Sequence, residues 1–249
     1  MMMAKFTLII RPQPDADRDV LWLQRYGVPA LASPVMRGIQ VAHEMPDPAS
    51  YDGVIFTSRH AVDAIRRSPT AAAWAAKPVF VVGAATAAAA HDAGFSQVIT
   101  GNGSGAGLIT PIRKVVAASR LTTGRLIWPS AVDVSFDMTA ALADLDVVRV
   151  PVYRMIAAAG FTAVITSALA DRNVAAVVAM SRRSIQLFRA GVSAARQDAA
   201  LASSSLIAGS NAIASAAGSG WQNIYIARQP RRSRLMAIAV LRHKREQQG

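Results

Sequence analysis

The sequence predicts an α/β protein made of two similar lobes, each a parallel β-sheet with helices on both faces. The first observation is an internal repeat, because residues 53–62 (GVIFTSRHAV) resemble residues 176–185 (AVVAMSRRSI). The second is that another apolar run ending in small residues follows each copy, at 79–87 (VFVVGAATA) and 205–214 (SLIAGSNAIA). The third is that short apolar runs alternate with alanine-rich stretches, which is typical of parallel sheets covered on both faces. Two such lobes make a ligand-binding cleft between them a reasonable expectation.

The positions of the two copies also predict how the chain is divided. The middle block contains one copy, the second copy begins near residue 157, and the strand and helix expected over 6–26 have no partner in the middle block. They can complete the sheet of the second copy. We therefore expect a discontinuous first lobe, a second lobe and a two-stranded ladder that connects them, assigned respectively to residues 1–35 plus 155–249, to 40–148, and to 36–39 with 149–154.

The elements follow from local patterns. Apolar runs of strand length are expected to form strands at 6–10, 30–34, 39–42, 54–57, 79–82, 98–100, 125–128, 147–153, 175–180, 205–208 and 224–227. Stretches with an apolar side, opened by capping residues or closed by glycine, are expected to form helices at 15–26, 58–67, 86–93, 108–118, 134–145, 161–169, 185–191, 212–218 and 235–241. The glycine-rich segment 101–107 lacks the Lys-Ser/Thr of a phosphate-binding loop. We interpret it as a flexible turn that enters a helix.

The composition excludes several classes of function. The 249 residues include no cysteine, so disulfides, thiol nucleophiles and cysteine-bound metals are excluded, and the cytosol is a compatible compartment. The four histidines show no metal-binding spacing, and no acidic cluster resembles a cation site, so no metal is expected. The longest uncharged stretch, 155–170, is too short and too polar for a membrane span, and we see no signal peptide. A cytoplasmic protein is the expectation.

The net charge of +12 points to an anionic ligand without choosing which one. Half of it comes from residues 228–249, which hold seven basic residues and one acidic residue. Arginine side chains suit carboxylates and phosphates. Nucleic acid is one alternative, although no helix-turn-helix with a basic recognition helix and no RNA-binding aromatic motif is found. That alternative would use Arg228, Arg231, Arg232, Arg234, Arg242, Lys244 and Arg245.

Hydroxyl side chains at the expected strand-to-helix turns are the main candidates for chemistry. They are Thr57, Ser58, Thr86, Ser181, Ser184 and Ser210. Each can be a simple helix cap. Together, with the free backbone N–H groups of helix N-termini, they can also hold a ligand with many carboxylates. Tyr153 ends a strand, where it is either a half-buried aromatic or a phenol that donates a proton or hydrogen bond.

At these positions the chain resembles the uroporphyrinogen-III synthase family over nearly its whole length. The resemblance rests on motifs in a fixed order: Arg11-Pro12, Ile55-Phe56-Thr57-Ser58 with Ala61-Val62, Val81-Val82-Gly83 with Thr86-Ala87, Ala93-Gly94-Phe95, Val152-Tyr153-Arg154, the Ser181/Ser184 turn and Ile226-Ala227-Arg228-Gln229-Pro230. It implies that hydroxymethylbilane, a linear tetrapyrrole polycarboxylate, loses water, inverts its last pyrrole through a spiro intermediate and closes to uroporphyrinogen III. It also implies a monomer that needs no cofactor.

The resemblance also assigns residues. It implies that Tyr153 assists departure of the hydroxyl group. It implies substrate binding by Arg11, Thr57, Ser58, Gly83, Thr86, Arg154, Ser181, Ser184 and Ser210. The chain departs from the family pattern where Ala212-Ile213 replaces a threonine and where Trp128-Pro129-Ser130 replaces a charged or glycine-containing turn. A non-catalytic two-lobe paralogue that binds an anionic ligand is therefore a further alternative.

Overall fold

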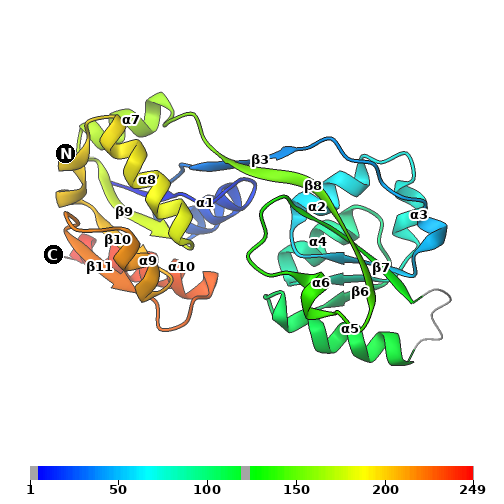
Figure 1. Ribbon diagram of the computed structural model, residues 1–249. Helices are drawn as coiled ribbons and strands as arrows, with labels where there is room; N and C mark the ends of the chain where they lie inside the picture. The colour runs from blue at the N-terminus through cyan, green and yellow to red at the C-terminus, as the bar shows by residue number, and fades with distance from the viewer. Residues whose placement is uncertain (1–4, 119–123, 249) are drawn as a thin grey trace. The chain divides into compact units, whose positions relative to one another are not determined.

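The chain folds into two compact units, each built on its own β-sheet (Figure 1). The computed structural model describes residues 5–118 and 124–248. Unit 1 comprises Met1–Arg37 and Ile156–Gly249, and unit 2 comprises Gly38–Met155. Both sheets are largely parallel and carry helices on both faces, which confirms the predicted fold class.

Unit 1 combines both ends of the chain in one parallel sheet, ordered β11-β10-β9-β1-β2. Leu8 of β1 pairs with Val177 of β9, so the N-terminal strand completes the sheet of the second repeat copy, as the sequence predicts. The elements of this unit are β1 (Phe6–Ile9), α1 (Asp15–Arg25), β2 (Ala30–Ala32), α7 (Ala163–Ala170), β9 (Val174–Ala179), α8 (Arg182–Ala194), the 3₁₀ helix η2 (Asp198–Ser203), β10 (Ser205–Ala208), α9 (Asn211–Ala216), β11 (Asn223–Ile226) and α10 (Arg232–Gln248).

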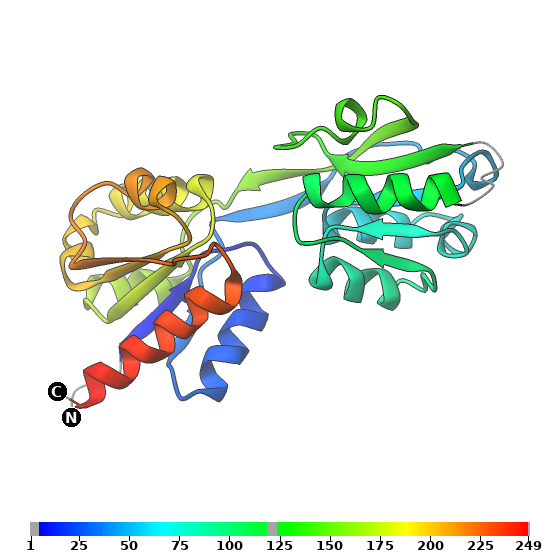
Figure 2. The same ribbon diagram turned by 90° about the horizontal axis from the view of Figure 1, so that it is seen from below.

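Helices cover both faces of this sheet. Ile9, Val178 and Ile207 pack with α1 and α10, which contact each other along one face. Figure 2 shows these two helices, blue and red, beside each other below the sheet, with α7, α8 and α9 on its other side. Successive strand residues point to opposite faces, so the uninterrupted apolar run of β9, buried throughout, serves both layers.

Unit 2 has the sheet order β3-β8-β7-β4-β5-β6. Strands β8, β7, β4, β5 and β6 run parallel to one another. The elements are β3 (Met36–Gln40), the 3₁₀ helix η1 (Pro48–Ser50), β4 (Gly53–Phe56), α2 (Arg59–Arg66), α3 (Ala71–Ala75), β5 (Val79–Val81), α4 (Ala84–Asp92), β6 (Val98–Thr100), α5 (Ala106–Ala118), β7 (Arg125–Ala131), α6 (Met138–Ala141) and β8 (Asp146–Ala157).

The strands of unit 2 divide their side chains between two cores. Val54 and Phe56 of β4 pack with α2, α3 and α4 on one face. Ile55, between them in sequence, packs with α5 and α6 on the other face. Neighbouring residues of a strand point to opposite faces, and here both faces are covered by helices. Every position of the strand is therefore apolar, and the run in the sequence is continuous.

Strands β3 and β8 both cross the boundary between the units, which lies at residues 37/38 and 155/156. The N–H of Val41 donates to the Val152 carbonyl at 3.1 Å, and the N–H of Ala158 donates to the Val35 carbonyl at 2.9 Å. Numbers rise on one strand as they fall on the other, so these two strands are antiparallel. The two-stranded ladder expected from the sequence is therefore present.

The two sheets share one internal plan. β4 and β5 carry one repeat copy, β9 and β10 carry the other, and each pair occupies the same place in its sheet order. Next to β4 the sheet continues with β7 and β8, and next to β9 with β1 and β2. An equivalent strand–helix–strand unit thus follows the repeat in unit 2, as β7, α6 and β8, and precedes it in unit 1, as β1, α1 and β2. The expectation that residues 6–26 have no partner in the middle block is therefore wrong, because the equivalent units stand in a different order along the chain.

One predicted helix is wrong. The segment 134–145 was expected to be helical throughout, but α6 covers only Met138–Ala141. Asp137 accepts hydrogen bonds from the N–H groups of Thr139 and Ala140, so it caps the helix and makes it start there. The residues before Asp137 remain an irregular loop. In the described parts of the chain, no helix has both the length and the apolar character needed to cross a membrane.

Candidate functional site

The candidate site lies where the strand order of unit 2 reverses. From β4 the chain proceeds to β5 and β6 on one side, then crosses to β7 and β8 on the other. β4 and β7 are parallel, so their carboxyl ends reach the same edge of the sheet. In open α/β sheets, ligands bind outside the carboxyl ends of the strands at such a reversal point.

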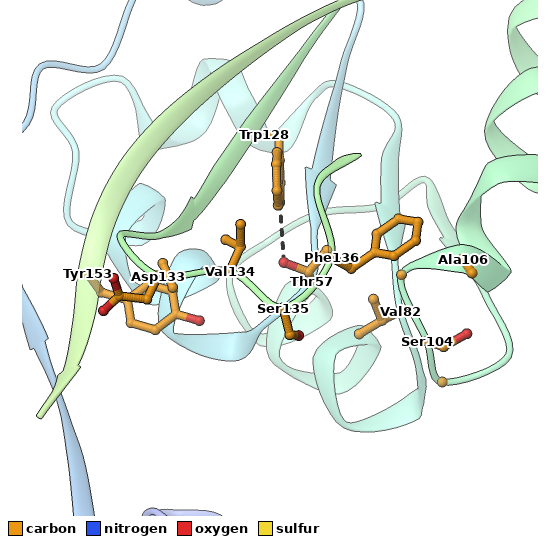
Figure 3. Close-up of a pocket in the computed structure, with 13 residues that line it drawn as sticks. Thr57, Val82, Ser104, Ala106, Trp128, Asp133, Val134, Ser135, Phe136 and Tyr153 are labelled. Carbon is orange, nitrogen blue, oxygen red and sulfur yellow. Dashed lines mark hydrogen bonds between the residues drawn. The ribbon is translucent and has the colours of Figure 1, made fainter. Parts of the chain in front are cut away.

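A pocket of about 440 Å³ opens at this edge (Figure 3). Its wall is formed by the turn after β4, the end of β5, the glycine-rich turn, the end of β7 with the following loop, and β8. The lining residues are Thr57, Val82, Gly103, Ser104, Gly105, Ala106, Trp128, Ala131, Asp133, Val134, Ser135, Phe136 and Tyr153. Two of the predicted site residues, Thr57 and Tyr153, therefore share one pocket although they are far apart in sequence.

Tyr153 contributes a phenol from β8. Only 7% of the residue is exposed, and its ring packs in a tilted arrangement against His60 with centroids 5.1 Å apart. Burial raises the pKa of the phenol above its ordinary value, and a hydrogen bond with Ser58 offsets this in part. The group is therefore protonated at neutral pH, as a hydrogen-bond donor or general acid must be.

Thr57 lies directly after β4 and is held from β7. The indole Nε1–H of Trp128 donates a hydrogen bond of 3.2 Å to Oγ1 of Thr57, drawn as the dashed line in Figure 3. Trp128 is fully buried. This contact ties together the two strands that flank the reversal point.

The glycine-rich turn lines the pocket, a role that the sequence interpretation did not give it. It does lead into a helix as predicted, since α5 begins at Ala106. Oγ of Ser104 accepts a hydrogen bond of 3.1 Å from the N–H of Gly107 in the first turn of α5. A Cβ atom on Gly105 would lie 2.6 Å from Cδ1 of Phe136, so glycine here lets the turn approach the opposite wall closely.

The loop 133–136 is the other part of the wall that sequence reasoning missed. It had been included in the helix expected over 134–145. Asp133 and Ser135 bring polar atoms to the pocket, and Phe136 brings an aromatic side chain (Figure 3). The capping motif Asp-x-Thr at 137–139, read as a helix start, was the available signal.

Four further predicted residues of unit 2 do not line the pocket. Ser58 caps α2, accepting a hydrogen bond from the N–H of His60, and also contacts Tyr153. Gly83 precedes α4, which begins without a side-chain cap. Thr86 lies in the first turn of α4 and is only 5% exposed. Arg154 is exposed and follows Tyr153 on β8, so the two side chains project to opposite faces.

Two of the three predicted serines of unit 1 cap helices. Ser181 accepts a hydrogen bond from the N–H of Ser184 at the start of α8, and their hydroxyl oxygens are 2.7 Å apart. Ser210 caps α9 by accepting from the N–H of Ile213. The interpretation as caps therefore describes the contacts of Ser181 and Ser210, whereas Ser184 lies in the first turn of α8 and contacts the cap Ser181.

Arg11 makes ion pairs within unit 1. Its guanidinium lies 2.8 Å from the carboxylate of Asp15 and 3.1 Å from that of Asp19. Asp19 is 1% exposed and also pairs with Arg232 at the start of α10. These contacts link the end of β1 to α1 and α10.

Part of the basic C-terminal cluster is also engaged within the fold. Arg232 pairs with Asp19 and lies over the ring of Trp22. Arg242 donates to the carbonyl of Ala175 at 2.7 Å and lies over Tyr225. Two of the seven basic residues considered for nucleic acid binding thus stabilise unit 1.

Among the residues that the structure describes, no group of three or more acidic or histidine side chains is arranged to hold a metal ion. A second pocket in unit 2, about 520 Å³, is lined by residues of the 40–45 segment and the end of α2 with the turn that follows. Its lining includes neither Tyr153 nor the carboxyl ends of the parallel strands β4, β5 and β7. The first pocket is therefore the better candidate.

A comparison with family models matches residues 20–237 to the model described as Uroporphyrinogen-III synthase HemD. The match covers most of the chain. The chain belongs to the uroporphyrinogen-III synthase family. A comparison with curated proteins gives no match.

Solved structures of this family share the fold. The uroporphyrinogen-III synthetase of Helicobacter pylori is 16% identical, with a TM-score of 0.63, over 96% of this chain and 99% of the other. A mutant uroporphyrinogen III synthase of the extremely thermophilic bacterium Thermus thermophilus is 17% identical, with a TM-score of 0.50, over 98% of this chain and 99% of the other. Sequence identity this low is evidence of a common fold alone.

Proposed function

We propose that this protein is a uroporphyrinogen-III synthase that cyclises hydroxymethylbilane. Family membership supports the reaction class. The location of the site is supported by one observation, the buried and protonated phenol of Tyr153. It lies in a pocket at the reversal point of the unit 2 sheet. No other described side chain of that pocket combines an acidic proton with such burial.

In the first step of the reaction, the protein must supply a proton or a hydrogen bond to the leaving hydroxyl group, and it does not need to supply a nucleophile. The hydroxymethyl carbon of the substrate loses its hydroxyl group as the adjacent pyrrole nitrogen pushes electrons toward it. We assign to Tyr153 the hydrogen bond or proton that lets this hydroxyl leave as water. The substituted carbon of the last pyrrole then attacks the azafulvene, and the spiro intermediate breaks and recloses with that ring inverted.

The remaining work is positioning. The substrate carries an acetate and a propionate on each of four pyrroles, so it offers carboxylates to every donor of the site. Thr57 is a donor within the pocket, and the start of α4 at Gly83, which has no side-chain cap, offers backbone N–H groups close to Val82. We keep Ser58, Thr86, Arg154, Ser181, Ser184 and Ser210 as proposed substrate contacts. For Arg11 we favour the role of stabilising unit 1.

The test is the isomer formed. Purified protein is supplied with hydroxymethylbilane generated enzymically, and the products are oxidised and separated as type I and type III isomers. We expect mainly type III, and a product mixture identical to that of a reaction without the protein would refute the proposal. Tetrapyrrole binding without turnover would identify the non-catalytic paralogue instead.

Tyr153→Phe tests the assigned acid. It removes the hydroxyl and keeps the ring that packs against His60. Loss of a general acid costs on the order of 10²-fold in turnover. We expect a drop of about that size or somewhat less, because positioning is distributed over many groups. Unchanged turnover would remove Tyr153 from the mechanism.

We also propose that the protein works as a monomer in the cytoplasm on a small molecule, without nucleic acid. The absence of cysteine is compatible with the cytosol, and the contacts of Arg232 and Arg242 within unit 1 engage two of the cations that a nucleic acid would need. The monomer is what the family resemblance implies. Light scattering of the purified chain checks the monomer. A nucleic-acid titration across salt concentrations checks the partner, since phosphate contacts give a steep salt dependence.

A further inference from the structure

The hydrogen bond between Trp128 and Thr57 fixes how the threonine hydroxyl can be used. An indole N–H is a donor only, so Oγ1 of Thr57 must be the acceptor in their 3.2 Å contact. The proton of the Thr57 hydroxyl is then left for a different acceptor. Thr57 lines the pocket, and Figure 3 shows its oxygen between the indole and the loop that carries Ser135.

The direction of the indole N–H is itself fixed. Trp128 is 0% exposed and packs between the strands of unit 2 and helices α5 and α6. The guanidinium carbon of Arg149 lies 5.5 Å from the centre of its ring. That guanidinium is anchored by hydrogen bonds of 2.9 Å to Oγ of Ser130, 2.9 Å to the carbonyl of Ala131 and 2.7 Å to that of Val132. A ring packed against this core and under an anchored guanidinium keeps one orientation, so its N–H stays directed at Thr57.

We propose that Trp128 is a positioning residue that presents Thr57 to the substrate as a hydrogen-bond donor. This inference rests on the proposed function and names what that site recognises. A hydrogen-bond donor at this position binds an acceptor group of the substrate. The carboxylates are the substrate groups richest in acceptor sites, and an ionised carboxylate has no proton to donate. The structure therefore assigns to Thr57 a carboxylate of the tetrapyrrole.

Four variants test this assignment in steady-state assays of type III formation. Thr57→Val removes the hydroxyl and Thr57→Ser keeps it. Trp128→Phe removes the N–H and keeps an aromatic ring, and the fourth variant combines Trp128→Phe with Thr57→Val. Removing a hydrogen bond to a charged group raises KM on the order of 10-fold or more, so we expect that for Thr57→Val, with kcat little changed. We expect near wild-type values for Thr57→Ser.

Trp128→Phe should raise KM in the same direction by a smaller factor, roughly 3- to 10-fold, because the hydroxyl can then rotate away from the substrate. The double variant should have the KM of Thr57→Val alone, since Trp128 acts only through Thr57. A Trp128→Phe effect that multiplies with that of Thr57→Val, or that changes thermal stability with KM unchanged, would overturn the inference.

Trp74→Phe is the matched control. Trp74 is also 0% exposed in unit 2, and within the described residues its Nε1 has no hydrogen-bond partner. Its replacement should leave KM unchanged. If it raises KM as Trp128→Phe does, the effect belongs to loss of core packing and the inference fails.

The same variants separate this inference from the proposed function. If the wild-type protein forms no type III product, the function fails, and the variants are compared by titration with the octacarboxylate uroporphyrin III. Weaker binding by Thr57→Val and Trp128→Phe, without further loss in the double variant, supports the donor role. Equal binding by all variants, or no binding by the wild type, contradicts it.

Discussion

The imidazole ring of His60 packs against the phenol ring of Tyr153, with centroids 5.1 Å apart and planes tilted by 40°. His60 belongs to the first turn of α2, two residues after the cap Ser58, which itself hydrogen-bonds to the phenol. On another side of the imidazole lies Gly38 of β3, where a Cβ atom would be 2.9 Å from Cε1 and Nδ1 of the ring. The environment of the proposed acid on β8 therefore depends on contacts among three elements, β8, α2 and β3.

Gly38→Ala is predicted to disturb Tyr153 without touching it. The added methyl group forces the His60 ring to move, and the phenol loses part of its cover. The pKa of Tyr153 should then fall toward the ordinary value of a phenol, as measured by ultraviolet titration against Tyr153→Phe as the blank. Overpacking of this kind costs about 1–3 kcal/mol in the free energy of unfolding.

The control for this substitution is Gly209→Ala in unit 1. There the new Cβ would meet its neighbours at 3.4 Å or more, which is ordinary contact. It should leave the tyrosine titration unchanged. If Gly38→Ala also leaves the Tyr153 titration unchanged, His60 does not shield the phenol.

The raised pKa of Tyr153 predicts a loss of stability in alkaline solution. In the unfolded chain the phenol titrates near its ordinary value of 10.0, whereas burial places the folded value above it. Between the two values the unfolded state binds fewer protons than the folded state, so the free energy of unfolding falls as pH rises. The stabilisation is fully present below the unfolded pKa.

Urea unfolding measures this loss of stability. The wild type and Tyr153→Phe are compared at several pH values above and below the ordinary phenol pKa of 10.0. The decline in stability should be smaller in the variant. Turnover should show no ionisation of Tyr153 from neutral pH up to about 10, because the protonated phenol is the working form. A loss of activity with a midpoint well below that pH, absent in a control for protein integrity, would contradict the assigned role.

Gly105→Ala is predicted to distort the pocket wall. A Cβ atom on Gly105 would lie 2.6 Å from Cδ1 and 3.0 Å from Cγ of Phe136, which is closer than side chains approach. The aromatic ring must shift, so we expect a KM increase of about 10-fold or less together with a loss of roughly 1–3 kcal/mol in stability. Adding Phe136→Leu should restore part of the affinity. If the pair behaves no better than Gly105→Ala, the clash with Phe136 is not the cause.

Asp19→Asn is predicted to destabilise unit 1. The carboxylate is 1% exposed and faces Arg11 and Arg232, which join β1, α1 and α10 through it. Asp19 is buried but its two arginine partners are partly exposed, so removing the carboxylate should cost roughly 1–3 kcal/mol, less than breaking a fully buried pair. Asp17→Asn, on the more exposed side of α1, is the control and should change stability by less than about 0.5 kcal/mol. Equal urea midpoints for the two variants would show that the cluster does not stabilise the unit.

The strands of the repeat could be predicted because their signal is local. Short apolar runs followed by small polar residues form β4, β5, β9 and β10. Such runs can be recognised directly from the hydrophobic pattern of the sequence. The helix expected over 134–145 was wrong because apolar residues also occur in a loop that packs into the core, as Phe136 does. Periodicity cannot distinguish these two situations, whereas the Asp137 cap does.

Taken alone, the amino-acid order determined the two α/β lobes, the two-stranded connection between them and the candidate hydroxyl groups, since each of these depends on short-range pattern or on an internal repeat. Only the tertiary structure decided which of those hydroxyl groups lie close to other residues of the site. Thr57 and Trp128 stand 71 positions apart and come together only because β4 pairs with β7. Whether a residue lines a pocket is a property of such long-range pairing, and no local run of residues encodes it.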